Sequence, residues 1–360
     1  MEASNAGNAV MPEKKRYEWI DNARIVAALL IIYGHMPQFF YFEPSINNSV
    51  AYDLVHATAF YGRVPFFLIL GGYFLGRRIT WEKAFDRALW LLIPFFLWNL
   101  IYYSLVVLPK ATEFHFWPDL LGMLGMTALF VPDFHLPGIE ASAPCIGVSW
   151  FLRDIVFLSL LTPLLVRYRY YMGMALILMV SYIPCNVLTD SHSILAPATC
   201  FYYVLGTCLS DFRISDAYRI LNKKFTPYLC VGLVAAVACS LCATLNGYAP
   251  MPVTLLGSVF GALMIAQCGV LVETYMPKFS KILAPCGPAC FLVFMLQEPL
   301  MSHLVWRLPH WFIQSWLVWL LPFAVCTFLI ILFLLMKRYT PWLLPYLGHM
   351  KIAKQEQKAS

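Results

Sequence analysis

Long apolar runs recur along the whole chain, and they restrict the folds it can adopt more than any other feature. Many reach about 18 residues or more, the length that an α-helix needs to cross a bilayer. Inside lipid every backbone N–H and C=O group must be paired, so only helices and closed barrels span it. The runs are continuous and do not alternate as barrel strands do. With 61% hydrophobic and 12% charged residues, the sequence predicts an all-α fold, a polytopic transmembrane helical bundle.

The apolar runs divide into about ten predicted spans, and both termini are expected to be cytoplasmic. The spans are approximately residues 19–37, 56–76, 87–108, 149–166, 171–188, 194–210, 227–246, 251–272, 285–306 and 314–336. The first lacks a small-residue cleavage site, so we expect it to stay as a helix. The stretch 117–131 is apolar but short and is followed by Pro132, which indicates a re-entrant or interfacial piece. The predicted organisation is a disordered tail over 1–12, a transmembrane domain over 13–345 and a basic cytoplasmic tail over 346–360.

The distribution of basic residues supports this layout. With both termini in the cytoplasm, 20 of the 25 Lys and Arg residues fall in cytoplasmic segments, and only Lys110 and Arg307 fall in outer loops. Cytoplasmic loops of membrane proteins carry such an excess, and it would collapse if 117–131 were a full span. The net charge of +6 therefore reflects topology, and no nucleic-acid partner is expected. The predicted location is a cell membrane, the inner or cytoplasmic membrane of a bacterium, with lipid around the helices. The long outer loop 109–148 is either solvated or functional.

Arg24 and His35 are the most informative polar pair. Both lie in the first apolar run, where an ionisable residue is costly and suggests a functional site. Their spacing of 11 residues is close to three helical turns, which places them on one face and about 16 Å apart along the axis. A fixed cation and a titratable base so arranged suit a site that holds an anionic carrier and deprotonates an acceptor. Alternatively, Arg24 is a boundary residue that pairs with Asp21, and His35 is a packed, hydrogen-bonded residue.

Other polar residues lie inside later spans. The predicted topology places the following residues in one layer of the middle-to-outer membrane: His35, Arg63, Arg153, Gln297 and Glu298. Each arginine has a structural alternative, an ion pair with an acidic neighbour that holds helices together. Glu298 precedes a proline and could neutralise either arginine.

The eleven cysteines show no metal-ligand spacing, so no metal is expected. Most lie in or beside apolar runs, where cysteine acts as a small hydrophobe. Cys286 and Cys290 are four residues apart on one helix face, which leaves a thiol pair open. Gly71 and Gly72 permit either close helix packing or a slot for a thin, pantetheine-like arm.

Four blocks of sequence resemble those of one enzyme family. The first holds an Asp, then Arg24, then His35 with ten residues between the last two. The second holds a Phe-Phe pair followed by two small residues, with Gly71 where Ser is usual, and the third is led by a tryptophan. The fourth has Gln297 where a His before proline is common. The blocks are residues 16–35, 63–74, 149–152 and 294–300. Over roughly 13–345 they resemble acyltransferase family 3, the integral-membrane O-acyltransferases.

The resemblance implies an acyl-CoA co-substrate, expected to be acetyl-CoA, that enters from the cytoplasm, and no bound cofactor. Arg24, supported by Asp21, would hold this carrier near the bilayer boundary. His35 would act as the general base on an acceptor hydroxyl, whose oxygen attacks the thioester directly. Such a base is typically worth about 10²–10⁴-fold in rate.

The implied acceptor is a hydroxyl group of a cell-surface glycan, a lipid-linked glycan or a related molecule. Arg63 would act in catalysis by stabilising the developing oxyanion, and the predicted substrate-binding residues are Arg153, Gln297 and Glu298. The alternative function is a transporter or flippase of an anionic or glycan substrate, in which buried arginines move the substrate. Inverted repeats would favour a transporter, and the sequence shows none.

Overall fold

The computed structural model describes residues 17–39, 50–76, 79–110, 113–130, 136, 143–182, 194–222, 230, 234, 251–305 and 307–348. This part of the chain is all-helical, 86% helix without a strand. Its longer helices are α1 (Glu18–Phe39), α3 (Val50–Leu75), α4 (Trp81–Tyr102), α7 (Trp150–Tyr182), α9 (Pro197–Leu209), α12 (Met251–Tyr275), α14 (Cys290–Val305) and α16 (Leu321–Tyr339). Its shorter helices are α5 (Phe116–Met123), α6 (Thr127–Phe130), α10 (Ile214–Leu221), α13 (Pro277–Leu283) and α15 (His310–Ile313). The π and 3-10 turns are η1 (Tyr103–Val107), η2 (Leu108–Lys110), η3 (Gly147–Ser149), η4 (Ala284–Ala289), η5 (Trp316–Leu320) and η6 (Pro341–Leu343).

Five helical segments of the described chain are long and apolar enough to cross a membrane. They are Trp81–Lys110, Gly147–Ile177, Leu255–Tyr275, Pro277–Val305 and Trp316–Tyr339. Helix α1 is long enough as well but less apolar, because it carries several polar residues over its length. The structure therefore supports a polytopic helical membrane protein.

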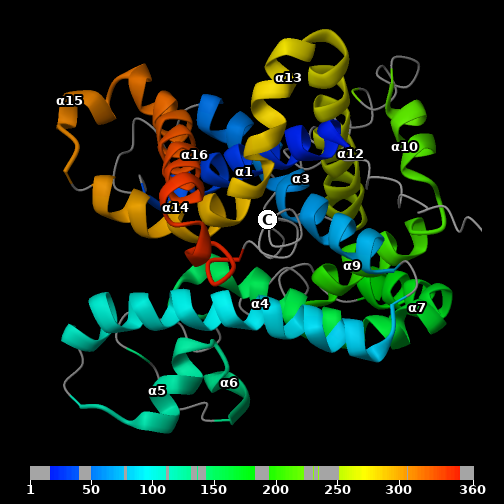
Figure 1. Cartoon of the computed structure of the whole chain (residues 1–360), viewed down its shortest axis with the longest axis horizontal. Helices are drawn as coiled ribbons and strands as arrows, with labels where there is room; N and C mark the ends of the chain where they lie inside the picture. Colours follow the sequence, from blue (N-terminus) through cyan, green and yellow to red (C-terminus); the bar gives the residue numbers. More distant parts are fainter. Residues whose placement is uncertain are drawn as a thin grey trace, which may run out of the picture.

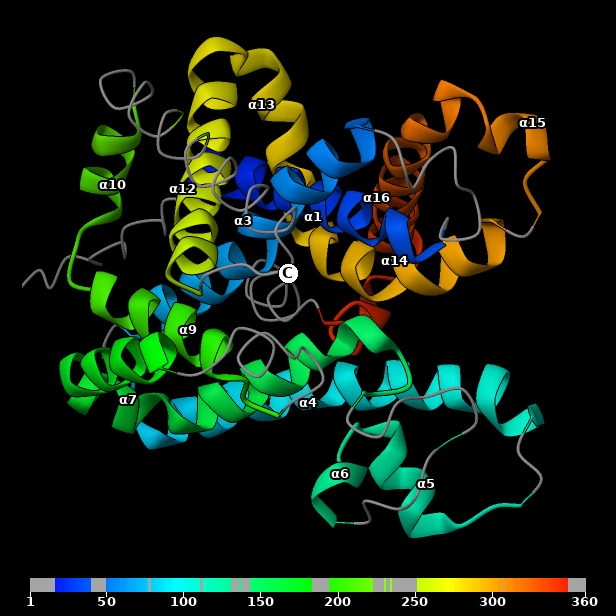
Figure 2. The same cartoon turned by 180° about the vertical axis from the view of Figure 1, so that it is seen from behind.

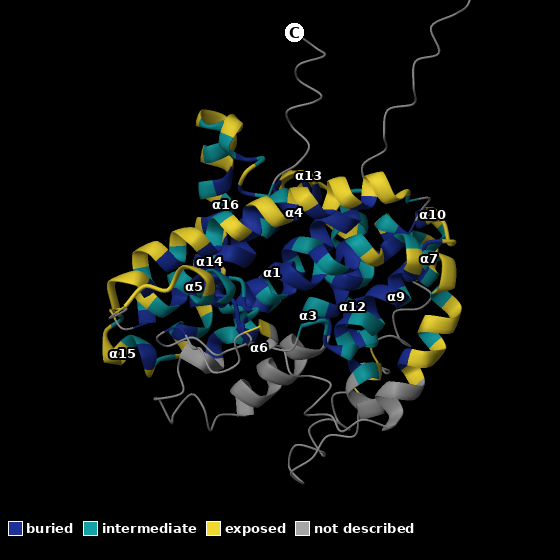
Figure 3. Cartoon of the chain, turned by 90° about the horizontal axis from the view of Figure 1, so that it is seen from below, coloured by how far each residue is buried: buried dark blue, intermediate teal, exposed yellow. Residues whose placement is uncertain are grey.

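Helix α3 lies at the centre of the bundle. It packs against α1, α9 and α12, while α7 bridges α9 and α4, and α14 bridges α1 and α16. Figures 1 and 2 show α4 along one side of the molecule, with α5 and α6 beyond it. Helices α14, α15 and α16 lie at the end of the molecule opposite α10 and α12, at the left in Figure 1. Figure 3 shows that α1 is buried inside the bundle, whereas α4 presents an exposed outer face.

The ring of Phe67 joins the three largest hydrophobic clusters of the described core. One cluster connects α3, α4, α7, α9 and α14, a second connects α1, α14 and α16, and a third connects α1, α3, α10 and α12; Phe67 packs against all three. It also meets the rings of Phe66 and Phe151 at centroid distances of 5.6 Å and 6.3 Å. The second block of family-like sequence therefore lies at the centre of the fold.

The predicted spans and the observed helices differ in informative places. The expected connection between spans 149–166 and 171–188 is instead a kink inside α7, at Tyr168 (φ −114°, ψ 17°). The stretch 117–131 forms the short helices α5 and α6, too short to cross a bilayer. The predicted span 227–246 and most of both predicted tails lie outside the described residues.

The glycine pair of α3 packs against α9. A Cβ atom on Gly72 would lie 2.1 Å from the carbonyl oxygen of Tyr203, and one on Gly71 would meet the Tyr203 ring at 3.5 Å. Gly206 of α9 approaches the backbone of α3 equally closely, since its Cβ would lie 2.1 Å from the carbonyl oxygen of Ile69. Small residues that let two backbones approach are typical of membrane helix pairs. The pair therefore serves helix packing rather than a slot for a substrate.

Candidate functional site

Helix α1 carries Arg24 and His35 within one unbroken helix. Arg24 Nη1 donates a hydrogen bond to Asp21 Oδ1 at 3.2 Å, which is the boundary ion pair considered above. The Arg24 side chain nevertheless stays 36% exposed, so this ion pair leaves room for an anionic ligand. His35 is half-buried three turns farther along the helix.

Asp21 is held between Arg24 and η4. The carboxyl group is buried, and a Cβ on Gly287 of η4 would lie 2.6 Å from Asp21 Oδ1. Only a glycine can sit so close to the carboxylate. Asp21 was predicted to help bind the carrier, and its observed surroundings suit a residue that orients Arg24.

Arg63 reaches α1 at the turn that carries His35. Its Nη1 donates a hydrogen bond to the carbonyl oxygen of Ile31 at 3.2 Å, and the side chain is buried. In an α-helix that carbonyl is the acceptor for the amide of His35. A Cβ atom on Gly34 would lie 1.3 Å from Arg63 Nη1 and 2.1 Å from Cζ. The guanidinium group therefore occupies a notch that exists only because Gly34 has no side chain. The structure brings the two predicted catalytic residues Arg63 and His35 to the same turn.

A second arginine, Arg87 of α4, acts electrostatically on the region of Arg24. Arg24 and the phenol of Tyr203 both lie within electrostatic range of Arg87. The Arg87 side chain is exposed to solvent. Two neighbouring cations repel each other unless an anion lies between them, so this pair is suited to bind phosphate groups.

Glu298 holds the start of α7. Its Oε2 accepts a hydrogen bond from the amide of Val148 at 2.9 Å, and the carboxylate lies against Gly147, where a Cβ would be 2.9 Å from Oε1. Beside it, the buried Asn99 of α4 donates a hydrogen bond to Ser149 Oγ at 3.0 Å. A carboxylate at a helix N-terminus is favourable. Glu298 was predicted to bind substrate, and these contacts give it a structural role.

Arg153 and Gln297 are both buried, in different surroundings. Arg153 Nη1 donates to the carbonyl oxygen of Gly125 at 2.8 Å, and its Nε donates to Asp154 Oδ1 at 3.2 Å. These contacts tie α7 to the segment between α4 and α7, which agrees with the ion-pair alternative. Gln297 is 1% exposed, and within the described chain neither atom of its amide has a hydrogen-bond partner.

The segment between α4 and α7 is held by polar contacts of its own. Asp119 Oδ2 accepts hydrogen bonds from Tyr103 Oη at 3.0 Å and from the amide of His115 at 2.9 Å. Burial, with the Asp119 carboxylate nearby, raises the pKa of the Cys145 thiol to about 12. That thiol is therefore protonated at neutral pH and is no nucleophile. No three His, Cys, Asp or Glu side chains of the described segments gather to hold a metal ion.

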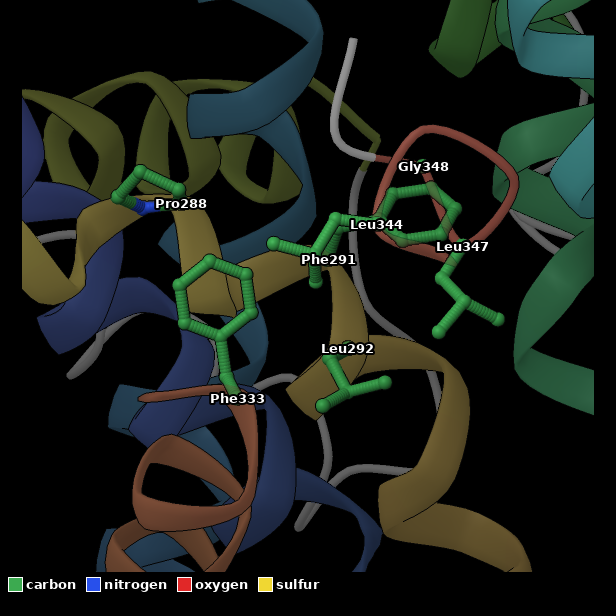
Figure 4. A pocket seen from close by; sticks show the side chains of 7 residues that line it. All are labelled: Pro288, Phe291, Leu292, Phe333, Leu344, Leu347 and Gly348. Atoms are coloured by element: carbon green, nitrogen blue, oxygen red, sulfur yellow. The ribbon is translucent and has the colours of Figure 1, made fainter. Parts of the chain in front are cut away.

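A small hollow lies where α14, α16 and the segment after η6 meet (Figure 4). Its lining includes Phe291, Leu292, Phe333 and Leu347, and all of its side chains are apolar. It offers no charged or hydrogen-bonding side chain to a phosphate or a hydroxyl group. The polar chemistry therefore concentrates along α1 and the helices that face it.

The sequence interpretation missed two residues of this site. Arg87 was counted only as a cytoplasmic charge, although it begins the predicted span 87–108 at the same membrane boundary as Arg24. Gly34 was passed over as an ordinary helix residue, although it immediately precedes His35. A second arginine at the same predicted depth and a glycine beside the base are the signals that could have found them.

The comparisons with known proteins agree with the motif-based expectation. A family model described as an acyltransferase domain, that of acyltransferase family 3, matches residues 17–337. No curated protein and no solved structure matches the chain. The matched range contains every residue of the site described above.

Proposed function

Because the chain belongs to acyltransferase family 3, we propose that it is a membrane enzyme that moves an acyl group from acyl-CoA to an acceptor hydroxyl. The acyl group is expected to be acetyl, and the acceptor is a cell-surface glycan or a related molecule. One observation carries the proposal. Arg63 is seated in the Gly34 notch, at the turn of α1 that carries His35. A base and a buried cation are thereby placed together inside a membrane helix bundle, where neither would be kept without a use.

In the proposed reaction His35 takes the proton of the acceptor hydroxyl as its oxygen attacks the thioester carbonyl. A C–O bond forms and the carbonyl oxygen becomes an oxyanion, which the positive charge of Arg63 stabilises. When the intermediate collapses, the C–S bond breaks and the CoA sulfur leaves as a thiolate. The proton held by His35 then passes to that sulfur, so no acyl-enzyme is required. Arg153 would orient the acceptor through the segment between α4 and α7, to which it is bonded at the carbonyl oxygen of Gly125.

Arg24 and Arg87 are the proposed contacts for the phosphates of CoA. We expect Arg24→Ala and Arg87→Ala each to raise the KM for acetyl-CoA by about tenfold, with a smaller effect on kcat, since one charge-assisted hydrogen bond contributes roughly this much. Initial rates at varied acetyl-CoA concentration test this. Arg219→Ala is the matched control, because Arg219 is an 82% exposed arginine paired only loosely with Asp216, at 3.6 Å. If both Arg24→Ala and Arg87→Ala lower kcat and leave the KM for acetyl-CoA unchanged, these arginines do not bind the phosphates of CoA.

The function itself is tested with acetyl-CoA labelled in the acetyl group. Membranes that contain the protein are expected to move the label from CoA to glycan or lipid-linked glycan, and membranes without it are not. A transporter or flippase would leave the label on CoA. Mass spectrometry of envelope glycans with and without the gene then identifies the acceptor by the loss of acetyl groups.

A further inference from the structure

Gln297 differs from the other buried glutamine of the described chain. The Gln267 side chain is 2% exposed and donates a hydrogen bond from Nε2 to the carbonyl oxygen of Leu221 at 3.1 Å. Gln297 is 1% exposed, and both Nε2 and Oε1 lack a hydrogen-bond partner within the part of the chain that the structure describes. Burying an amide without partners is costly, and buried polar groups of native proteins are nearly always paired. The unpaired amide of Gln297 therefore suggests that its hydrogen-bond partners belong to a bound ligand.

The helix position of this amide places it near the proposed chemistry. Val293 and Met301 lie four residues before and after it, hence on the same face of α14. Both pack in one cluster with Ile32 and Met36 of α1. These two α1 residues flank the turn that carries the proposed general base, so the orphaned amide faces that turn.

The neighbouring residue fixes the rotation of α14 at this point. Glu298 is bonded to the amide of Val148 at 2.9 Å, so this turn of α14 is anchored to the start of α7. The side chain of Gln297 is therefore kept toward α1 and away from lipid.

We propose that Gln297 binds a secondary amide of a bound substrate. A carboxamide donates from Nε2 and accepts at Oε1, and a secondary amide carries the matching acceptor and donor. The N–H and C=O of a trans amide point in opposite directions, so such a group pairs with one atom of Gln297 while a neighbouring polar group of the same ligand pairs with the other. An oxyanion accepts but does not donate, so alone it would leave Oε1 unpaired. The inference rests on the proposed function, which supplies two sources of such an amide. One is the pantetheine arm of the acyl-CoA donor, whose nearer amide lies only a few bonds from the thioester, and the other is an N-acetyl group of a glycan acceptor.

The test compares Gln297→Met with wild type in purified protein, using CoA and an N-acetylglucosamine oligosaccharide as probes in calorimetric titrations. Methionine has a similar length and no hydrogen-bonding amide. If pantetheine is the source, CoA binding weakens about tenfold, the effect of two lost neutral hydrogen bonds, and oligosaccharide binding is unchanged. If the acceptor is the source, the oligosaccharide loses affinity and CoA does not.

The melting temperature separates this role from a structural one. Because the amide has no partner to lose, Gln297→Met is expected to melt at the same temperature as wild type or higher. Gln267→Met, which removes a bonded amide, is expected to melt lower and to keep its affinity for CoA. A lower melting temperature for Gln297→Met, or unchanged responses to both probes, overturns the inference. If either of these results is found while wild-type membranes still transfer labelled acetyl groups, only the inference about Gln297 fails and the proposed function stands. If wild-type membranes transfer no label, the proposed function fails and this inference fails with it.

Discussion

Replacing His35 with alanine is expected to slow acyl transfer by about 10²–10⁴-fold, the usual contribution of a positioned general base. Without the imidazole, the acceptor hydroxyl has no group to take its proton as it attacks the thioester. The affinity for acyl-CoA should change little, because the proposed phosphate contacts, Arg24 and Arg87, lie at the other end of the site. The measurement is the rate at which label leaves acetyl-CoA in membranes with matched amounts of each protein.

His303→Ala is the matched control for His35. His303 is an exposed histidine of α14 whose Nδ1 lies 2.9 Å from the carbonyl oxygen of Pro299. Its removal should leave the transfer rate within a factor of about two, because surface substitutions of this kind usually have small effects. Turnover by His35→Ala at the wild-type rate would exclude His35 as the base.

The sequence predicted helix α1 well, because helix periodicity is a local property. Arg24 and His35 could be assigned to one face from spacing alone, and α1 is one continuous helix. The depth of Arg63 followed from counting residues from the predicted membrane boundary. Its seat against Gly34 could not be predicted, since it depends on how α3 packs on α1, and that contact joins segments about 30 residues apart.

The kink of α7 falls at the connection predicted between two spans, and the structure gives it as a bend rather than a loop. Arg167 and Arg169 are among the 20 basic residues that the predicted topology places in cytoplasmic segments. In the structure Arg169 forms an ion pair with Asp211 and also donates to the carbonyl oxygen of Thr207 at 3.3 Å. These partners come from α9 and the turn after it, so the helix continues past the basic residues with only Tyr168 out of helical conformation.

Gln297 and Glu298 show why adjacent residues need a structure to be told apart. Both were predicted to bind substrate from the same motif and the same depth. The packing of α14 turns Glu298 to the start of α7, where it is bonded, and leaves the amide of Gln297 without a partner in the described chain. The roughly 100° between successive helix residues separates a structural carboxylate from a candidate ligand contact.

Replacing Gly34 with alanine is expected to reduce acyl transfer about 10²-fold, as much as Arg63→Ala does, because the new Cβ would occupy the place of the guanidinium group. That Cβ would lie 1.3 Å from Nη1, so the guanidinium group at the end of the flexible Arg63 side chain must shift out of the notch. Removal of one oxyanion-stabilising group typically costs this much. The measurement is kcat with acetyl-CoA in matched membranes. Gly173→Ala is the control, since its Cβ would meet only Val204 at 3.9 Å, and it should transfer at the wild-type rate.

A double-mutant cycle decides whether Gly34 acts through Arg63. In the Arg63→Ala background the notch is empty, so Gly34→Ala should cause no further loss, and the two effects should be non-additive as expected for residues in contact. A general weakening of α1 cannot explain the loss, because alanine favours a helix over glycine by about 1 kcal/mol. Losses that multiply in the double variant, or a Gly34→Ala protein that transfers at the wild-type rate, would show that the seat of Arg63 does not matter for the reaction. If the losses do not multiply, the role of Gly34 is to admit the arginine to the turn of His35.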